Sequence, residues 1–84
     1  MPLLEERVFK TADIYVPAKR RRTLNPKTVD EIAESMIEEG QRTPILVRED
    51  GARMVLVEGF HRLEACKALG EATIVGVVVQ ARPH

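Results

Sequence analysis

The residues best suited to chemistry follow one another at positions 58–62, with the sequence Glu-Gly-Phe-His-Arg. They stand where an apolar run ends and a helical pattern begins. The first N–H groups of a helix have no partner inside it, and the helix dipole is positive there. Gly59 has no side chain, so the backbone can approach a ligand closely. We therefore predict an anion site at residues 59–62, with phosphate as the favoured ligand.

Arg62 is the cation closest in sequence to the predicted anion site. The helical pattern covers about residues 60–69, with Gly70 as its end, and Arg62 lies beside the apolar stripe of that helix. Side chains lean towards the amino end of a helix, so its guanidinium is expected near the Gly59 turn. A buried arginine without an anion is costly. Arg62 therefore needs either a ligand or an internal carboxylate, for which Glu58 is the nearest candidate along the chain.

A hairpin precedes this stretch. Residues 45–48 are expected to form a strand after Pro44, residues 49–52 a turn with an Asp-Gly signal, and residues 53–57 the returning strand. A β-branched strand is predicted over residues 73–80, and short extended pieces over residues 7–11 and 13–16. Together with the helices, this order predicts one small domain of mixed α/β (α+β) class over residues 1–84.

The clearest helix is predicted after Asn25, a good N-cap, with Pro26 at its first position and Gly40 just past its end. One apolar stripe at helical spacing is expected to be buried: Val29, Ile32, Ala33, Met36 and Ile37. Ser35 is expected to bond within its own helix or to face solvent. The acidic residues of another face are expected to be solvated and not to bind a metal: Asp30, Glu34 and Glu38.

Four consecutive cations precede that helix: Lys19, Arg20, Arg21 and Arg22. A run of like charges is usually a solvated loop. The alternative is a loop that faces phosphate or DNA. The sequence leaves both interpretations open.

Composition limits the classes of function. The 84 residues carry 13 Lys plus Arg and 13 Asp plus Glu, so the formal net charge is zero, unlike that of most whole-domain nucleic-acid binders. The single cysteine, Cys66, cannot form an internal disulfide. The sequence has neither an apolar run long enough to cross a membrane nor a secretory signal. We expect a cytoplasmic protein that does not interact with membranes.

Three segments resemble the amino-terminal domain of ParB-type partition proteins, within the group that shares a fold with sulfiredoxin. Residues 24–36 (LNPKTVDEIAESM) resemble the family's first helix, and residues 40–47 (GQRTPILV) resemble its entry into a strand. Residues 59–65 (GFHRLEA) match the glycine and second arginine of the partition proteins' GERR box and the Gly-x-His-Arg of sulfiredoxin. The resemblance extends over residues 14–79 and implies a mixed sheet with two main helices.

The resemblance implies that a nucleoside triphosphate binds with its phosphates at this helix start, CTP as in partition proteins or ATP as in sulfiredoxin, with Mg²⁺ as a candidate companion ion. Gly59, His61 and Arg62 match phosphate-binding positions, and Phe60 lies within the same stretch. Ser35 matches a hydroxyl that faces the nucleotide in sulfiredoxin. Arg21 is similar to an arginine that precedes the first helix of partition proteins.

The departures from the family pattern matter as well. Phe60 occupies the position of sulfiredoxin's reactive cysteine, and Cys66 lies on the apolar stripe, where a small core residue is expected. Sulfinic-acid repair is therefore not expected. His61 replaces the first arginine of the GERR box, and these 84 residues contain no counterpart of the DNA-reading helix-turn-helix.

These observations favour a nucleotide-binding module that acts as a regulatory or DNA-partition or transcription accessory protein. Its expected partners are a nucleotide, DNA or a DNA-binding protein, and a second copy of itself. One alternative is an ATP-dependent phosphotransferase or NTPase, with Glu58 or His61 as the base. Another is DNA binding or nuclease activity through the cations at positions 19–22. The structural alternative is an Arg62–Glu58 pair beside a simple glycine turn.

Overall fold

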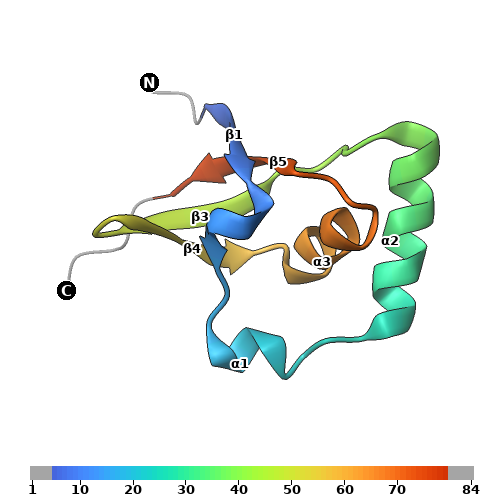
Figure 1. The fold of residues 1–84 in the computed structure, drawn as a ribbon, viewed down its shortest axis with the longest axis horizontal. Coiled ribbons are helices and arrows are strands. Elements are labelled where there is room, and N and C mark those ends of the chain that lie inside the picture. The colour runs from blue at the N-terminus through green and yellow to red at the C-terminus, as the bar shows by residue number, and fades with distance from the viewer. Residues whose placement is uncertain (1–4, 80–84) are drawn as a thin grey trace.

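The structure of this chain is a computed structural model that describes residues 5–79. Its helices pack against a mixed five-stranded sheet. Figure 1 shows the elements in their order along the chain. They are β1 (Glu6–Lys10), a 3-10 turn η1 (Thr11–Asp13), β2 (Ile14–Tyr15), α1 (Ala18–Arg21), α2 (Pro26–Glu39), β3 (Ile45–Asp50), β4 (Arg53–Glu58), α3 (Phe60–Ala68) and β5 (Thr73–Val78).

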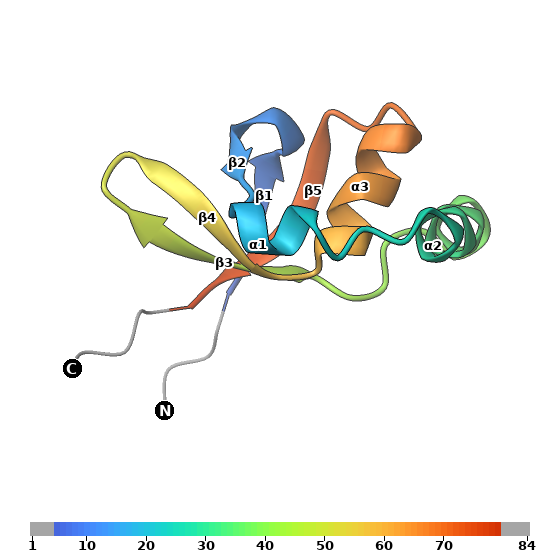
Figure 2. The same cartoon turned by 90° about the horizontal axis from the view of Figure 1, so that it is seen from below.

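The strands lie in the order β1-β5-β3-β4-β2. The pairs β1–β5 and β3–β4 are antiparallel, whereas β3–β5 and β2–β4 are parallel. Figures 1 and 2 show α3 between the sheet and α2, so that α2 forms an outer layer. The predicted class, a small mixed α+β domain with two main helices, is confirmed. None of the helices described over residues 5–79 is long and apolar enough to cross a membrane.

Helix α2 begins and ends as the sequence predicts. The Asn25 side chain accepts hydrogen bonds from the N–H groups of Lys27 and Thr28, and Pro26 occupies the first turn, where a missing N–H costs nothing. Gly40 ends the helix with φ 73°. The predicted buried stripe is wrong at Ile37, which is 71% exposed because nothing within residues 5–79 covers that side of the last turn.

The hairpin is also present, with strands longer than predicted. β3 continues to Asp50 and β4 to Glu58, so the turn consists of residues 51 and 52. Gly51 adopts φ 62° there, a conformation that glycine reaches without steric cost. The hairpin register shifts by a bulge between Leu46 and Val47. The end of β4 leads directly into α3.

Two predictions for the amino-terminal part are wrong. Thr11 and Asp13 belong to the 3-10 turn rather than to extended pieces. The Thr11 hydroxyl donates to the carbonyls of Glu71 and Ala72, which fixes this turn against the chain before β5. The basic run, expected to be a loop, forms the short helix α1, and its arginines reach backbone carbonyls elsewhere in the fold.

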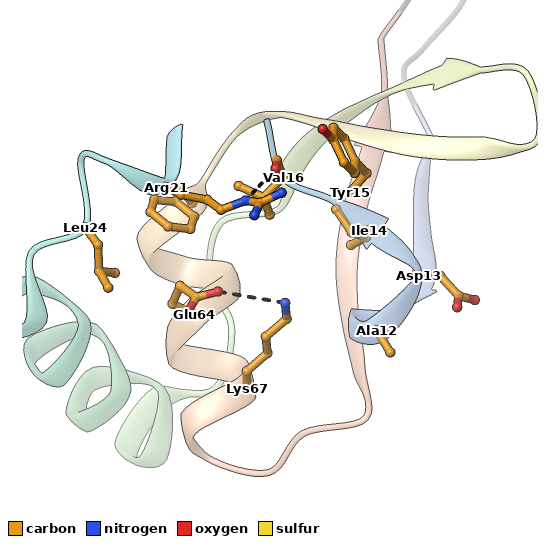
Figure 3. Close-up of a pocket in the computed structure, with 10 residues that line it drawn as sticks. Ala12, Asp13, Ile14, Tyr15, Val16, Arg21, Leu24, Glu64 and Lys67 are labelled. Carbon is orange, nitrogen blue, oxygen red and sulfur yellow. Dashed lines mark hydrogen bonds and ion pairs between the residues drawn. The ribbon is translucent and has the colours of Figure 1, made fainter. Parts of the chain in front are cut away.

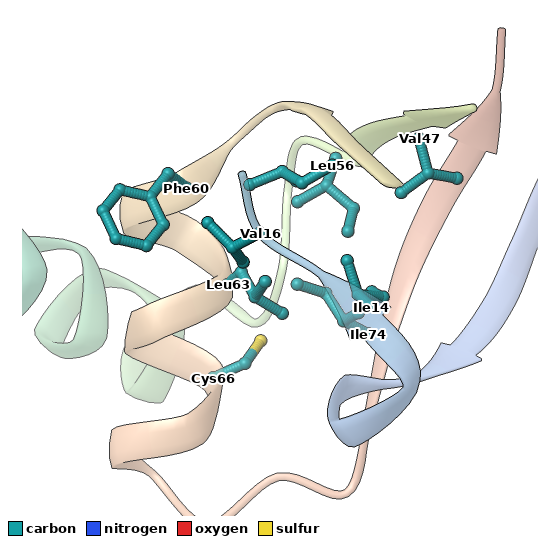
Figure 4. Packing of buried hydrophobic residues seen from close by; sticks show 9 residues of the cluster. Ile14, Val16, Val47, Leu56, Phe60, Leu63, Cys66 and Ile74 are labelled. Carbon is teal, nitrogen blue, oxygen red and sulfur yellow. The ribbon is translucent and has the colours of Figure 1, made fainter. Parts of the chain in front are cut away.

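The core lies between α3 and the sheet (Figure 4). Leu63 and Cys66 of α3 are 0% and 1% exposed, and they point towards the buried residues of β3, β4, β5 and β2. Cys66 is thus a core residue, as predicted. Phe60 is also buried, at 7% exposure. The face of α3 that carries Leu63 and Cys66 holds the helix start in a fixed position at the end of β4.

Candidate functional site

Gly59 is required at the turn between β4 and α3 for two reasons. Its φ of 104° and ψ of 29° lie in the left-handed region, which other residues enter only with strain. A Cβ at this position would also lie 2.7 Å from Cγ2 of the fully buried Ile45. The missing side chain therefore lets the helix start approach β3 closely. These constraints come from the fold itself and apply without any ligand.

Within the described part of the chain, no side chain caps the first turn of α3. Gly59 offers no side chain, and its carbonyl accepts the first helical bond from the N–H of Leu63 at 2.9 Å. The N–H groups of Phe60, His61 and Arg62 consequently have no acceptor within the helix. At the start of α2, by contrast, Asn25 supplies an acceptor. The start of α3 is therefore able to receive an anion.

Arg62 lines a cavity of about 460 Å³ between the start of α3 and the carboxyl-terminal half of α2. Ser35 lines the same cavity, so the structure brings these two predicted residues together. Within residues 5–79, Arg62 forms no ion pair, and the expected alternative of an Arg62–Glu58 pair is not found. Glu58 is exposed and does not line this cavity. The guanidinium is thus available for an anion.

Glu39 was not predicted as a member of this site. Its carboxylate accepts from the Ser35 hydroxyl at 3.3 Å and from Arg42 Nη1 at 3.0 Å, at the edge of the same cavity. The i, i+4 spacing from Ser35 to Glu39 on a predicted helix was a signal that could have found it. Ser35 therefore bonds to a side chain one turn later in its helix. The cavity contains two arginines and one carboxylate among the described residues that line it.

His61 joins the two helices. Its Nε2 accepts a hydrogen bond from the N–H of Asn25 at 3.0 Å, so it fixes the start of α2 against the start of α3. With Nε2 as the acceptor, a neutral ring carries its proton on Nδ1, which can donate to an anion. His61 thus has a structural contact in addition to the predicted binding role.

Arg21 and Phe60 lie on the other side of α3. They line a second cavity of about 510 Å³ that includes Tyr15 and the ion pair between Glu64 and Lys67 (Figure 3). Arg21 Nε donates to the carbonyl of Val16 at 3.0 Å. The predicted residues therefore do not converge on one cavity, because Arg62 and Phe60 project from opposite faces of the same helix.

The basic run is more than a solvated segment. Arg20 donates to the carbonyl of Val57 and Arg21 to that of Val16, so both hold α1 against strand ends. Lys19 and Arg22 are exposed.

Among residues 5–79, no group of three or more His, Cys, Asp or Glu side chains is arranged to hold a metal ion.

Comparison with known proteins identifies the family and the fold of this chain. The family described as the ParB N-terminal domain matches residues 7–83. A curated relative is the probable chromosome-partitioning protein ParB of Campylobacter jejuni, 34% identical over 62 residues, or 74% of this chain. The match covers 22% of the Campylobacter protein.

Solved structures share the fold. Sulfiredoxin from Arabidopsis thaliana has a TM-score of 0.83 and 27% identity, over 92% of this chain and 86% of that one. C-terminally truncated ParB from Caulobacter crescentus, solved with CTP-γ-S, has a TM-score of 0.79 and 24% identity, over 93% of this chain and 46% of that one. A free serine kinase solved with AMP has a TM-score of 0.78 and 18% identity, over 90% and 31% of the two chains.

Proposed function

The chain belongs to the ParB N-terminal domain family, and on that premise we propose that it binds a nucleoside triphosphate with the phosphates at the start of α3. The observation that carries this proposal is the uncapped first turn of α3 beside Arg62, which has no carboxylate partner within residues 5–79. Backbone amides without acceptors and an unpaired arginine in the same helical turn favour a polyanion over a neutral ligand.

Each residue of the helix start has a role in this proposal. The amides of Phe60, His61 and Arg62 receive phosphate oxygens, and Gly59 lets the backbone approach them. The guanidinium of Arg62 binds two oxygens at once. Nδ1 of His61 adds a further donor, while its Nε2 keeps the contact with Asn25. Phe60 contributes its amide alone, because its side chain is buried in the core.

The cavity next to Arg62 has room for part of the ligand. Its volume of about 460 Å³ lies within the range of small-molecule sites. Ser35 exchanges its contact with Glu39 for one with the nucleotide, and Glu39 is the carboxylate best placed to join a phosphate-bound Mg²⁺. On the other side of α3, Arg21 provides a second cation to the same ligand or to DNA.

The related structures support nucleotide chemistry and leave the base open. The Caulobacter protein was solved with CTP-γ-S, and the free serine kinase with AMP and with ADP. We therefore keep CTP and ATP as the two candidates. Membership of the family supports a regulatory or DNA-partition or transcription accessory role, and a DNA partner belongs to the same proposal.

We favour binding over catalysis. A catalytic base must lie within reach of the acceptor. Glu58 is exposed and lies outside the residues that line either cavity described above, and Nε2 of His61 already accepts from Asn25. Phe60, where sulfiredoxin has its reactive cysteine, removes the nucleophile for sulfinic-acid repair.

Isothermal titration with CTP, ATP and GTP, with and without Mg²⁺, tests the proposal. We expect one of the three to bind, and we expect Arg62→Ala to weaken its affinity by about tenfold or more, because a charged hydrogen-bonding pair is lost. Binding should also raise the melting temperature, since the ligand stabilises only the folded state.

Arg53→Ala is the matched control, because Arg53 is an exposed arginine of the hairpin that pairs with Asp50, stacks on Tyr15 and does not line the cavity next to Arg62. It should leave the affinity unchanged. The proposal is wrong if no nucleotide binds at millimolar concentration, or if Arg62→Ala and Arg53→Ala bind equally well.

A further inference from the structure

Among residues 5–79, strand β1 lies at one end of the sheet and pairs with β5 alone. The N–H and C=O of Val75 in β5 both bond to the side chain of Gln41, and the N–H of Val79 donates to Val47 of β3. The odd-numbered residues of β5 therefore direct their backbone groups away from β1. Val8 pairs with Val75, so its own N–H and C=O point to the open edge.

The remaining contacts of this ladder agree. Arg7 and Phe9 lie opposite Gly76 and Ile74, whose backbone groups face β1. The next alternate residue, Thr11, keeps this alternation, because its N–H donates to the carbonyl of Ala72 at 3.0 Å. The residues whose backbone groups face the open edge are Glu6, Val8 and Lys10. All three are exposed, with Val8 at 68%. The edge thus presents three donors and three acceptors in regular spacing.

This edge is complementary to itself. If a second copy pairs antiparallel with a twofold axis at Val8, the outward groups of each strand meet those of the other in hydrogen-bonded pairs. Glu6 then lies opposite Lys10 of the second copy, Lys10 lies opposite its Glu6, and the two Val8 side chains are neighbours. Parallel or shifted registers lose this match of charge.

We propose that β1 is a self-association edge, through which two copies of this chain join their sheets antiparallel around Val8. The charges on β1 would ordinarily keep an edge strand solvated. In this register Glu6 of each copy attracts Lys10 of the other. The two charges therefore disfavour pairing with unrelated strands and favour pairing with a second copy of this chain. The surface is separate from the nucleotide site and does not depend on it.

Apolar surface next to the edge adds to the interaction. Val8 and Ile37, at 68% and 71%, are the two most exposed large hydrophobic residues among residues 5–79, and both line one groove of about 450 Å³. In the dimer the two exposed Val8 side chains lie next to each other, which removes part of this apolar surface from water. One short strand per copy buries less than about 1,200 Å², so we expect a weak, concentration-dependent dimer.

Sedimentation equilibrium from about 10 μM to about 1 mM, the range of weak interfaces, should show reversible dimerisation. Glu6→Lys alone and Lys10→Glu alone each place like charges at both symmetric contacts, and each should weaken the dimer by about tenfold. An equimolar mixture of these two variants should associate again, because each then meets the opposite charge. Glu38→Lys, on the exposed face of α2, is the control and should change nothing.

Amide exchange locates the contact. In dilute solution the N–H groups of Arg7 and Phe9 should be protected and those of Glu6, Val8 and Lys10 should exchange quickly; at high concentration all five should be protected. Circular dichroism verifies that each variant is folded. A chain that stays monomeric up to about 1 mM overturns the proposal. So does a dimer that is indifferent to both charge changes, or a mixture of the two variants that does not associate.

Discussion

Gly59 is the residue at which the demands of the fold and of the proposed ligand coincide. Its backbone conformation and its contact with Ile45 both require the absence of a side chain. The same absence leaves the first turn of α3 without a cap from the Gly59 side chain. A glycine at such a position is therefore weak support for binding when taken alone, and Arg62, which the fold leaves without a partner among residues 5–79, carries more weight.

Gly59→Ala should lower the free energy of unfolding by about 2–4 kcal/mol, because it combines left-handed strain with a Cβ forced against a buried side chain. Gly51→Ala is the matched control, since Gly51 also has positive φ, 62°, but its Cβ would meet nothing within 4 Å. It should cost about 1 kcal/mol. Urea denaturation measures both. Equal losses would show that the contact with Ile45 is of no consequence.

Cys66 should be chemically inert in the folded chain. Its side chain is 1% exposed, and burial raises the pKa of the thiol above its ordinary value of 9.0, with Glu71 adding to the rise and Arg62 opposing it. Because the pKa of this thiol is higher in the folded chain than in the unfolded chain, its contribution to stability is fully present at pH values below the unfolded pKa. This stabilisation is lost as pH rises from about 9 through the folded pKa.

Urea denaturation between pH 7 and pH 10.5 should therefore show a steeper loss of stability for the natural chain than for Cys66→Ala, which has no thiol to titrate. A thiol reagent at pH 8 should react with Cys66 only after denaturant is added. Rapid labelling of the native chain, or identical pH profiles for the two proteins, would contradict this account.

At the scale of elements, Gln41 completes the sheet before β3 begins. Its side-chain amide donates to the carbonyl of Val75 and accepts from its N–H, both at 2.8 Å, as a strand residue would. One side chain thus substitutes for backbone pairing at the start of β5. It also fixes which backbone groups of β5, and hence of β1, remain for other contacts.

Gln41→Glu should destabilise the chain by about 1–3 kcal/mol, because a carboxylate can accept from the Val75 N–H but opposes its carbonyl. The amide of Val75 should also exchange faster with solvent. Arg42→Gln, at the neighbouring and largely exposed position, should change stability by less than about 0.5 kcal/mol. If Gln41→Glu is as stable as the natural chain, the bonds between the Gln41 amide and Val75 do not contribute to stability and the prediction is wrong.

The sequence predicted the elements whose ends are marked by nearby capping or turn residues. Asn25, Pro26 and Gly40 delimit α2, and the Asp-Gly turn sets the hairpin, because caps and turns act within a few residues. Helix α1 was missed because its arginines are stabilised by carbonyls of Val16 and Val57, a contact that spans 37 residues in the second case. Ile37 was misjudged because helical spacing does not reveal how far a covering surface extends.

The candidate site followed the same division. The helix start at Gly59 is a local property, so the sequence predicted it, whereas the orientation of Arg62 towards that turn stays a prediction. The sequence could not tell on which side of α3 each remaining residue lies. That depends on the packing of α2 and α1, which brings Ser35 and Glu39 to one face of α3 and Arg21 to the other.

At the scale of the whole molecule, the pairing of β1 with β5 constrains how the chain reaches its fold. Thr11 bonds to Ala72, 61 residues away, whereas β3 and β4 are joined by a tight turn. Closing a long loop costs more entropy than closing a short one, so we expect β1 to be added late. Until then β5, a strand of six residues without a charge, has an open edge. We expect misassembly through the β5 edge to be most probable in that interval, until the charged strand β1 covers it.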